Sequence, residues 1–254
     1  GEKMARAALA CRAVRLASSR LCSSSSSSSS LYETHVPLSR VQRPLVAAGA
    51  AVGALLRPAR ADLVAALGET TGERALRRMH SRMQSDETGR EILLERPRVT
   101  DDVLERAWEL PPETFGGAYA AFMGKRRFSP SERPPVRFVD DEELAYVAAR
   151  AREVHDLWHV LFGCKTTVLG ELALKAVEFA NTGLPMCGLA VAGGPLRLPM
   201  EQRTRFYTTY LPWAARAGTQ AHDLMCIYYE RHFDESLTSV RARFNISVAP
   251  DMLK

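Results

Sequence analysis

Hydrophobic and polar residues recur along this chain with the period of an α-helix. The pattern is clearest between Asp140 and Gly163, where hydrophobic residues are spaced by three and four positions: Leu144, Val147, Ala151, Val154, Trp158 and Leu161. This spacing places them on one face of a helix that begins at Asp140 and ends at Gly163. A second helix is expected from about Thr167 to Asn181. The short segment between the two helices then makes them an αα-hairpin.

Further helices are expected on both sides of this hairpin. Towards the N-terminus they are Leu45–Leu56 with Pro44 in its first turn, a short helix from Asp62 to Gly68, a helix after the capping-box sequence Thr70–Glu73, and Glu113–Met123. Towards the C-terminus we expect a loop, Gly188–Pro199, and then two long amphipathic helices, Glu201–Ala217 and Gln220–Phe244. No alternating strand pattern of useful length is present. The fold class is therefore all-α, with a single helical domain.

The excess of basic residues is concentrated at the N-terminus. The net charge is +5, from 34 basic and 29 acidic residues, and residues 1–30 contain five of the basic residues but only one acidic residue, Glu2. The remainder is nearly neutral, which argues against a general affinity for nucleic acid. Residues 4–22 combine arginine, alanine, leucine and serine without an acidic side chain. That composition is typical of a mitochondrial transit peptide.

A serine-rich spacer follows this basic segment. Ser23–Ser30 are all serine, which predicts a flexible low-complexity stretch. We therefore expect residues 1–30 to be a disordered presequence with its spacer, and residues 31–254 to form the helical domain. A secretory signal would need an unbroken apolar run, which Arg12 and Arg15 interrupt. The alternative is a disordered tail without a targeting role.

The cysteines argue against a protein stabilised by disulfides or by a CxxC zinc site, and the apolar segments argue against a transmembrane protein. Five cysteines at irregular spacings give no disulfide framework and no CxxC zinc pattern, so Cys164, Cys187 and Cys226 are expected to be free thiols. No apolar run reaches the roughly 18–20 residues needed to span a bilayer.

The segment Leu45–Leu56 contains a GxxxG spacing, Gly49 to Gly53, between flanking arginines. It is either a buried helix or a surface that contacts a membrane or a partner helix.

One short motif contains the candidate metal ligands of the chain. His155, Asp156 and His159 lie on one stripe of the first hairpin helix, because positions i, i+1 and i+4 fall within about 100° of one another. Glu171 lies about one turn into the second helix, where the hairpin places it beside His159. Imidazole and carboxylate ligands suit zinc, and also iron or manganese. The alternative is an exposed polar face on which Glu171 points into water.

The motif is also similar to the HExxH motif of zinc proteases, in which the glutamate activates water. Here the carboxylate is Asp156, whose side chain is one methylene shorter. Direct ligation by Asp156 therefore fits better than a role as general base, and a metallohydrolase is the weakest of the functional hypotheses.

HDxxH followed after eleven residues by glutamate is the hallmark of the Coq4 family of ubiquinone-biosynthesis proteins. Four further segments look like family segments: Leu67–Gly72, Arg137–Tyr146, Thr182–Cys187 and Ile227–Arg231. The chain resembles this family over roughly residues 31–248. The resemblance implies a mitochondrial protein attached peripherally to the matrix side of the inner membrane, within a multi-enzyme complex for ubiquinone synthesis. It also implies zinc bound by His155, Asp156, His159 and Glu171.

The activity that the resemblance implies is removal of the C1 carboxylate from a polyprenylated 4-hydroxy-3-methoxybenzoate intermediate. A divalent metal would act as a Lewis acid, and Asp156 or Glu171 would deliver a proton to the ring carbon. Four protein ligands fill a tetrahedron, so the site is five-coordinate or one carboxylate shifts to admit substrate. An oxidative reaction would require iron or another redox metal in place of zinc.

Two other expectations concern partners. In the alternative function, the protein is a nonenzymatic scaffold or lipid-binding subunit that organises the other ubiquinone-biosynthesis enzymes, and its metal is structural. The prenyl tail of the benzoate or quinone lipid needs an apolar groove, which Leu45–Leu56 and the apolar faces near Trp158, Phe162 and Phe179 would line if they are not simply core. Exposed apolar stripes on helical proteins also favour a homodimer.

Overall fold

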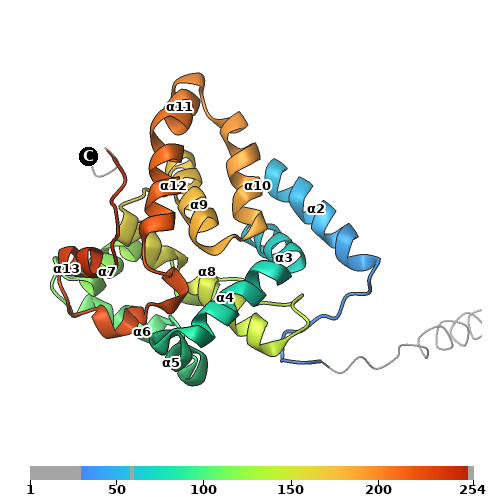
Figure 1. Cartoon of the computed structure of the whole chain (residues 1–254), viewed down its shortest axis with the longest axis horizontal. Helices are drawn as coiled ribbons and strands as arrows, with labels where there is room; N and C mark the ends of the chain where they lie inside the picture. Colours follow the sequence, from blue (N-terminus) through green and yellow to red (C-terminus); the bar gives the residue numbers. More distant parts are fainter. Residues whose placement is uncertain (1–29, 58–59, 251–254) are drawn as a thin grey trace, which may run out of the picture.

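The protein is an all-α domain, as the periodicity predicts (Figure 1). The computed structural model describes residues 30–57 and 60–250. Within these residues the α-helices are α2 (Gln42–Leu56), α3 (Ala61–Thr71), α4 (Glu73–Ser85), α5 (Glu87–Glu95), α6 (Asp101–Trp108), α7 (Phe115–Arg126), α8 (Glu142–Phe162), α9 (Val168–Thr182), α10 (Pro185–Gly193), α11 (Met200–Arg205), α12 (Leu211–Gln220) and α13 (Leu237–Arg243). The expected transit peptide and most of the serine spacer lie outside the described residues.

Shorter helical turns join several of these elements. They are the 3-10 turns η1 (Pro130–Glu132), η2 (Gly194–Arg197), η4 (Leu224–Cys226) and η5 (Tyr229–His232), and the π-helical η3 (Phe206–Tyr210), which connects α11 to α12. The only β-type pairing within the described residues is an isolated antiparallel bridge between Thr114 and Ser236. Cys164, Cys187 and Cys226 are buried free thiols, as expected.

Helix α8 is the central element of the core. Its N-terminus is capped by Asp141, whose carboxylate accepts a hydrogen bond from the Leu144 amide at 3.1 Å. Its C-terminus ends at Gly163 in the left-handed conformation, with φ of +68°. The helix begins after Asp141 and not at Asp140, because the Asp140 carboxylate pairs with His35 and Arg43 instead. Trp158 is fully buried, and its indole nitrogen donates to the Tyr229 hydroxyl at 2.7 Å.

Helix α9 completes the hairpin that the sequence predicts. Thr167 caps its N-terminus by accepting a hydrogen bond from the Gly170 amide at 3.2 Å, and Gly183 ends it with φ of +70°. One face of α9 packs against α10 and α12, while Glu171 in its first turn faces α8. These caps fix the register between α8 and α9 and therefore the position of Glu171 relative to the two histidines.

The expectations were wrong in three segments. Helix α3 continues through Gly68 to Thr71, and the Thr70 hydroxyl donates back to the Ala66 carbonyl instead of forming a capping box. The expected loop Gly188–Pro199 is helical as far as Arg197, since Pro185 suits the first turn of α10. The expected helix Gln220–Phe244 is divided into η4, η5 and α13.

Helix α2 is a surface helix, so its interpretation as a buried helix was wrong. Leu45, Val52 and Leu56 are 66%, 59% and 72% exposed. Among the described residues, none beyond the backbone of α2 itself would lie within 4 Å of a Cβ added to Gly49, while Ala50 on the opposite side packs against α3. Residues 45, 49, 52 and 56 share one helix face. We call Leu45, Val52 and Leu56 the outer stripe of α2.

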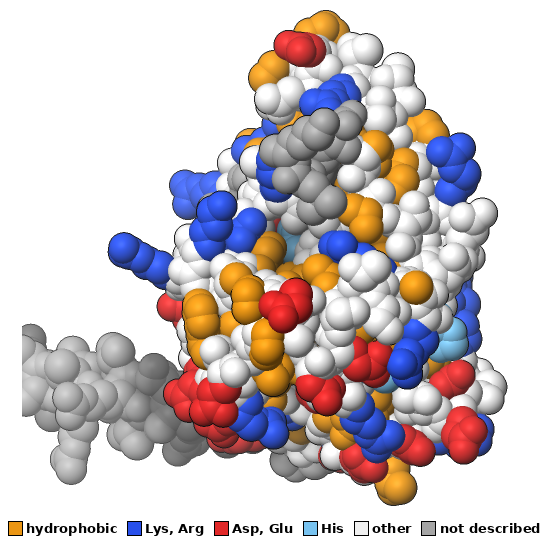
Figure 2. All heavy atoms as spheres, turned by 90° about the vertical axis from the view of Figure 1, so that its left-hand side faces the viewer, with side chains coloured by type: hydrophobic (Ala, Val, Ile, Leu, Met, Phe, Trp, Pro, Cys, Tyr) orange, Lys and Arg blue, Asp and Glu red, His pale blue; other side chains and the backbone are white. Residues whose placement is uncertain are grey.

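The charged surface is mixed. In the face that Figure 2 shows, acidic side chains gather mainly towards the lower edge, Lys and Arg side chains lie both above and among them, and hydrophobic side chains occupy the area between. A histidine side chain is visible in a hollow of this face. No helix in the described part of the chain combines the length and hydropathy needed to cross a bilayer.

Candidate metal centre

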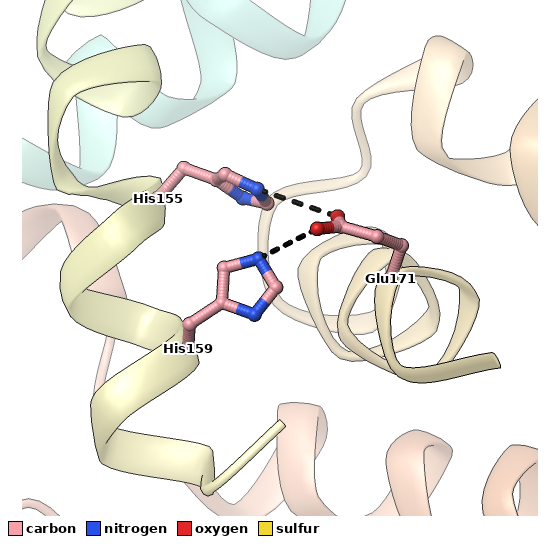
Figure 3. Close-up of side chains that lie close together, drawn as sticks. All are labelled: His155, His159 and Glu171. Carbon is pink, nitrogen blue, oxygen red and sulfur yellow. Dashed lines mark ion pairs between the residues drawn. The ribbon is translucent and has the colours of Figure 1, made fainter. Parts of the chain in front are cut away.

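Two histidines of α8 and one glutamate of α9 point toward one another (Figure 3). His159 Nε2 lies 3.1 Å from one Glu171 carboxylate oxygen, and His155 Nε2 lies 3.6 Å from the other. The potential ligand atoms of these three residues are all within 4.8 Å of one another. His155 and His159 are one helical turn apart, which is why both rings reach the same carboxylate.

The other ring nitrogen of each histidine has a hydrogen-bond acceptor. His155 Nδ1 lies 2.8 Å from Glu178 Oε1, and His159 Nδ1 lies 3.0 Å from the backbone carbonyl of Cys164. Each acceptor favours the tautomer that carries its proton on Nδ1, which leaves Nε2 free as a ligand on the side of Glu171. Both rings are therefore oriented for metal binding by groups outside the ligand set.

The charges at this site are strongly coupled. Burial and the Lys175 ammonium oppose protonation of His155, but the Glu178 and Glu171 carboxylates outweigh them and raise the pKa of His155 to about 9. Burial opposes ionisation of Glu171, yet the neighbouring His155 and His159 rings hold its pKa well below the usual value. Below about pH 9, a proton on His155 would therefore compete with a metal for this group.

Asp156 is not brought to the same point. Its carboxylate accepts hydrogen bonds from Arg133 Nη2 at 2.6 Å and from Arg133 Nε at 3.3 Å. Both side chains are largely buried, with 14% of Arg133 and 18% of Asp156 exposed. Of the four expected ligands, the structure therefore groups His155, His159 and Glu171, and it places Asp156 in an ion pair beside them.

Several residues at this site were not identified from the sequence. Behind His155, the buried Glu178 carboxylate also accepts hydrogen bonds from Lys175 Nζ and, at 3.3 Å, from Cys187 Sγ. Glu171, Lys175 and Glu178 are spaced i, i+4 and i+7 on α9, so the helical periodicity alone could have indicated a shared polar face.

A second group covers the outer side of His159. The Phe122 ring stacks on the His159 ring, with centroids 5.3 Å apart and an angle of 25° between the planes. The Arg126 guanidinium carbon lies 3.8 Å from the Phe122 centroid, and its Nε donates to Thr166 Oγ1 at 2.9 Å. Because α7 supplies these residues from another part of the sequence, no local pattern could have linked them to the motif.

The donor set fits a divalent metal. Two imidazole nitrogens and one carboxylate oxygen are the protein ligands of many catalytic zinc sites, and three protein ligands leave a position for water or substrate. Both histidines also have the supporting hydrogen bonds that ligands of this kind usually have.

The sequence model of a family described as "Coenzyme Q (ubiquinone) biosynthesis protein Coq4" matches residues 32–250. The chain belongs to the Coq4 family. It is 45% identical over 224 residues to the mitochondrial ubiquinone biosynthesis protein COQ4 of Arthroderma otae, covering 87% of this chain and 84% of the relative. The corresponding human homologue, also named mitochondrial, is 44% identical with the same coverage.

A solved structure shares the fold of this Coq4 family member. The crystal structure of a Nostoc punctiforme protein aligns with a TM-score of 0.62 at 23% identity, covering 79% of this chain and 97% of that one. The family model and the relatives, not this structure, confirm the resemblance inferred from the motif and its companion segments, at the level of a family of coenzyme Q biosynthesis.

Metal affinity is expected to rise with pH until about pH 9. The pKa of His155 is raised to about 9, so below that pH a proton must leave before a metal binds. The apparent Co²⁺ affinity should increase by about tenfold per pH unit from roughly pH 7 and level off above pH 9. Chelator competition at several pH values measures this slope, and proton release in weak buffer provides an independent check. An affinity that does not change over this range would contradict the expectation.

Proposed function

We propose that this Coq4 family member is a metal-dependent lyase of ubiquinone biosynthesis, which removes the C1 carboxylate of a polyprenylated 4-hydroxy-3-methoxybenzoate. The observation that supports this most is the convergence of His155 Nε2, His159 Nε2 and the Glu171 carboxylate within 4.8 Å. His155, His159 and Glu171 would hold the metal, with Asp156 beside them. Zinc suits these ligands best, and iron suits them as well.

The chain's own residues supply binding and proton transfer. A bound divalent metal would act as a Lewis acid toward the aryl carboxylate. Arg126, held over Phe122 next to His159, would bind the anionic head group. Burial lowers the pKa of its guanidinium, and the Glu171 and Asp156 carboxylates offset part of this effect. The bond between C1 and the carboxylate breaks, carbon dioxide leaves with the bonding electrons retained on C1, and a proton from water replaces it. Glu171 would relay this proton, and Asp156, held by Arg133, is the second carboxylate nearby.

The proposal is tested with purified protein and a prenylated 4-hydroxy-3-methoxybenzoate, before and after removal of metal. We expect carbon dioxide release that disappears with a chelator and returns with added metal. Bound lipid and bound metal without any release of carbon dioxide would overturn the lyase. That result would favour the second function, a nonenzymatic scaffold or lipid-binding subunit for the other ubiquinone-biosynthesis enzymes.

The scaffold function is favoured by a specific observation, the number of exposed apolar side chains near α2 and α10. Besides the outer stripe of α2, Leu189, Leu196 and Met200 are 52%, 69% and 71% exposed. In Figure 1, α11 lies at the upper end of the molecule, α10 runs below it, and α2 lies to the right of α10. Exposed apolar side chains gathered in this way are typical of surfaces that bind a partner or a lipid.

We further propose that the protein acts in mitochondria as a peripheral protein on the matrix side of the inner membrane. The names of its relatives support the organelle. The outer stripe of α2 supports attachment to the membrane, because exposed leucines and a valine lie between Arg40 and Arg57, which are also exposed. An exposed apolar helix face with flanking arginines can bind anionic lipid surfaces through buried apolar area and charge attraction.

Replacing Leu45 and Leu56 by glutamate together is expected to weaken binding to vesicles of anionic phospholipid by at least about tenfold, since each buried leucine contributes roughly 1.5–3 kcal/mol when fully inserted. Vesicle flotation measures the effect. Leu94→Glu is the matched control, because Leu94 is 85% exposed on α5, which lies at the lower edge of the molecule in Figure 1, away from α2. Equal binding by the double variant and wild type would show that α2 is not the contact.

A further inference from the structure

The buried carboxylate behind His155 belongs to neither the recognised motif nor the ligand group. We propose that Glu178 is the positioning residue of the metal centre: it fixes the His155 ring with Nε2 toward the metal and shields that metal from the Lys175 ammonium. This inference rests on the metal-binding part of the proposed function and is independent of the reaction catalysed.

Glu178 receives donors from three helices. It is 3% exposed on α9, and His155 Nδ1 of α8 lies 2.8 Å from its Oε1. Lys175 Nζ lies 2.9 Å and 2.8 Å from its two oxygens, and Cys187 Sγ of α10 donates to Oε2 at 3.3 Å. A buried carboxylate with this many donors has a defined position, and His155 takes its orientation from that position.

A comparison with Glu69 shows what is particular to Glu178. Glu69 is also 3% exposed, and it accepts hydrogen bonds from Arg152 Nη2 and from the backbone amides of Arg137 and Phe138. None of these partners belongs to the ligand group, so Glu69 has no contact with a candidate metal ligand. Glu178 differs in that one of its donors is the ring nitrogen of a histidine whose other nitrogen faces Glu171.

The position of Lys175 makes the carboxylate necessary. Its Nζ lies 3.3 Å from His155 Nδ1, so a positive charge stands directly behind a residue that would bind a cation. Two like charges at such short range repel strongly inside a protein. Glu178 lies against both groups and neutralises the ammonium. Its removal should therefore affect the metal in two ways, through loss of the Nδ1 acceptor and through exposure of the site to the Lys175 charge.

The test is the affinity of the full chain for Co²⁺, measured by chelator competition and by the cobalt absorption spectrum. Glu178→Gln is expected to bind Co²⁺ about 10–100-fold more weakly than wild type, the range typical for residues that orient metal ligands. Glu69→Gln removes an equally buried carboxylate and is expected to keep the wild-type affinity and spectrum. Folded Glu178→Gln with wild-type affinity would overturn the proposal, and so would an equal loss in Glu69→Gln.

A second variant keeps the test decisive if Glu178→Gln does not fold. Lys175→Met combined with Glu178→Leu replaces the buried pair by apolar residues, an exchange that proteins often tolerate. The double variant still lacks the acceptor for His155 Nδ1, and we expect at least about tenfold weaker Co²⁺ binding. Wild-type affinity in this variant would overturn the positioning role. Wild-type protein that binds Co²⁺ but releases no carbon dioxide would overturn the lyase and leave this inference intact.

Discussion

Glu171→Ala is expected to weaken Zn²⁺ or Co²⁺ binding by at least about 100-fold, which exceeds the effect of losing a residue that only orients a ligand. Glu171 supplies the sole carboxylate oxygens that face both His155 Nε2 and His159 Nε2 among the residues the structure describes. Without it, two imidazoles remain, and they lack the anionic partner that balances the dication. The side chain is 37% exposed, so its truncation leaves the packing of α9 largely unchanged. Chelator competition measures the loss.

Asp156→Asn is the matched comparison, because Asp156 adjoins His155 in the same motif. Its carboxylate is engaged by Arg133 and lies outside the ligand group. We expect its metal affinity to fall by less than about tenfold, the lower end of the range for residues near metal ligands. If Asp156→Asn loses as much affinity as Glu171→Ala, then Asp156 leaves Arg133 to become a ligand, as the four-ligand interpretation of the motif requires.

Local sequence patterns are sufficient to place Glu171 beside the histidines, but they are not sufficient to predict the orientation of Asp156. The hairpin follows from signals that lie within it: the hydrophobic spacing along α8, Gly163 directly after the last residue of α8, and the Thr167 cap of α9. Those signals also place Glu171 beside the histidines. The orientation of Asp156 depends on Arg133, which follows η1 in a segment whose position relative to α8 no local pattern specifies.

The groups that orient the two histidines also divide into those that a local sequence pattern could indicate and those that it could not. Glu178 shares a helix face with Glu171 and could have been identified from its spacing on α9. The Cys164 carbonyl that accepts from His159 is exposed to the ring by the turn at Gly163, which a sequence pattern predicts only as a helix end. Phe122 and Arg126 reach the site from α7 through tertiary packing.

The C-terminal segment is where helical periodicity was most misleading. Residues 220–244 have an amphipathic pattern, but Tyr229 turns inward so that its hydroxyl accepts from Trp158 and donates to the Leu224 carbonyl at 2.7 Å. Glu230 next to it reaches the buried Arg150. These two contacts with α8 stabilise a chain of short turns, η4 and η5, in place of one continuous helix.

The ion pair between Arg150 and Glu230 should therefore have a large effect on stability. Arg150 is 1% exposed in the middle of α8, and its two terminal nitrogens each donate to one Glu230 oxygen, with Nη2 to Oε2 at 2.8 Å. Glu230→Gln leaves the guanidinium buried without a counter-charge. The free energy of unfolding is expected to fall by about 3–5 kcal/mol, the usual result of breaking a buried pair by removing one partner.

Urea denaturation measures this loss, and Glu73→Gln is its control. Glu73 pairs with Arg77 at 2.9 Å, but the two side chains are 56% and 59% exposed, so solvent screens the interaction and the free energy of unfolding should hardly change. Similar stability of the two variants would mean that Arg150 finds another partner when Glu230 is lost. Because α8 carries both Arg150 and the two histidines, a stability loss specific to Glu230→Gln would also show that the C-terminal turns stabilise the helix that carries two of the candidate metal ligands.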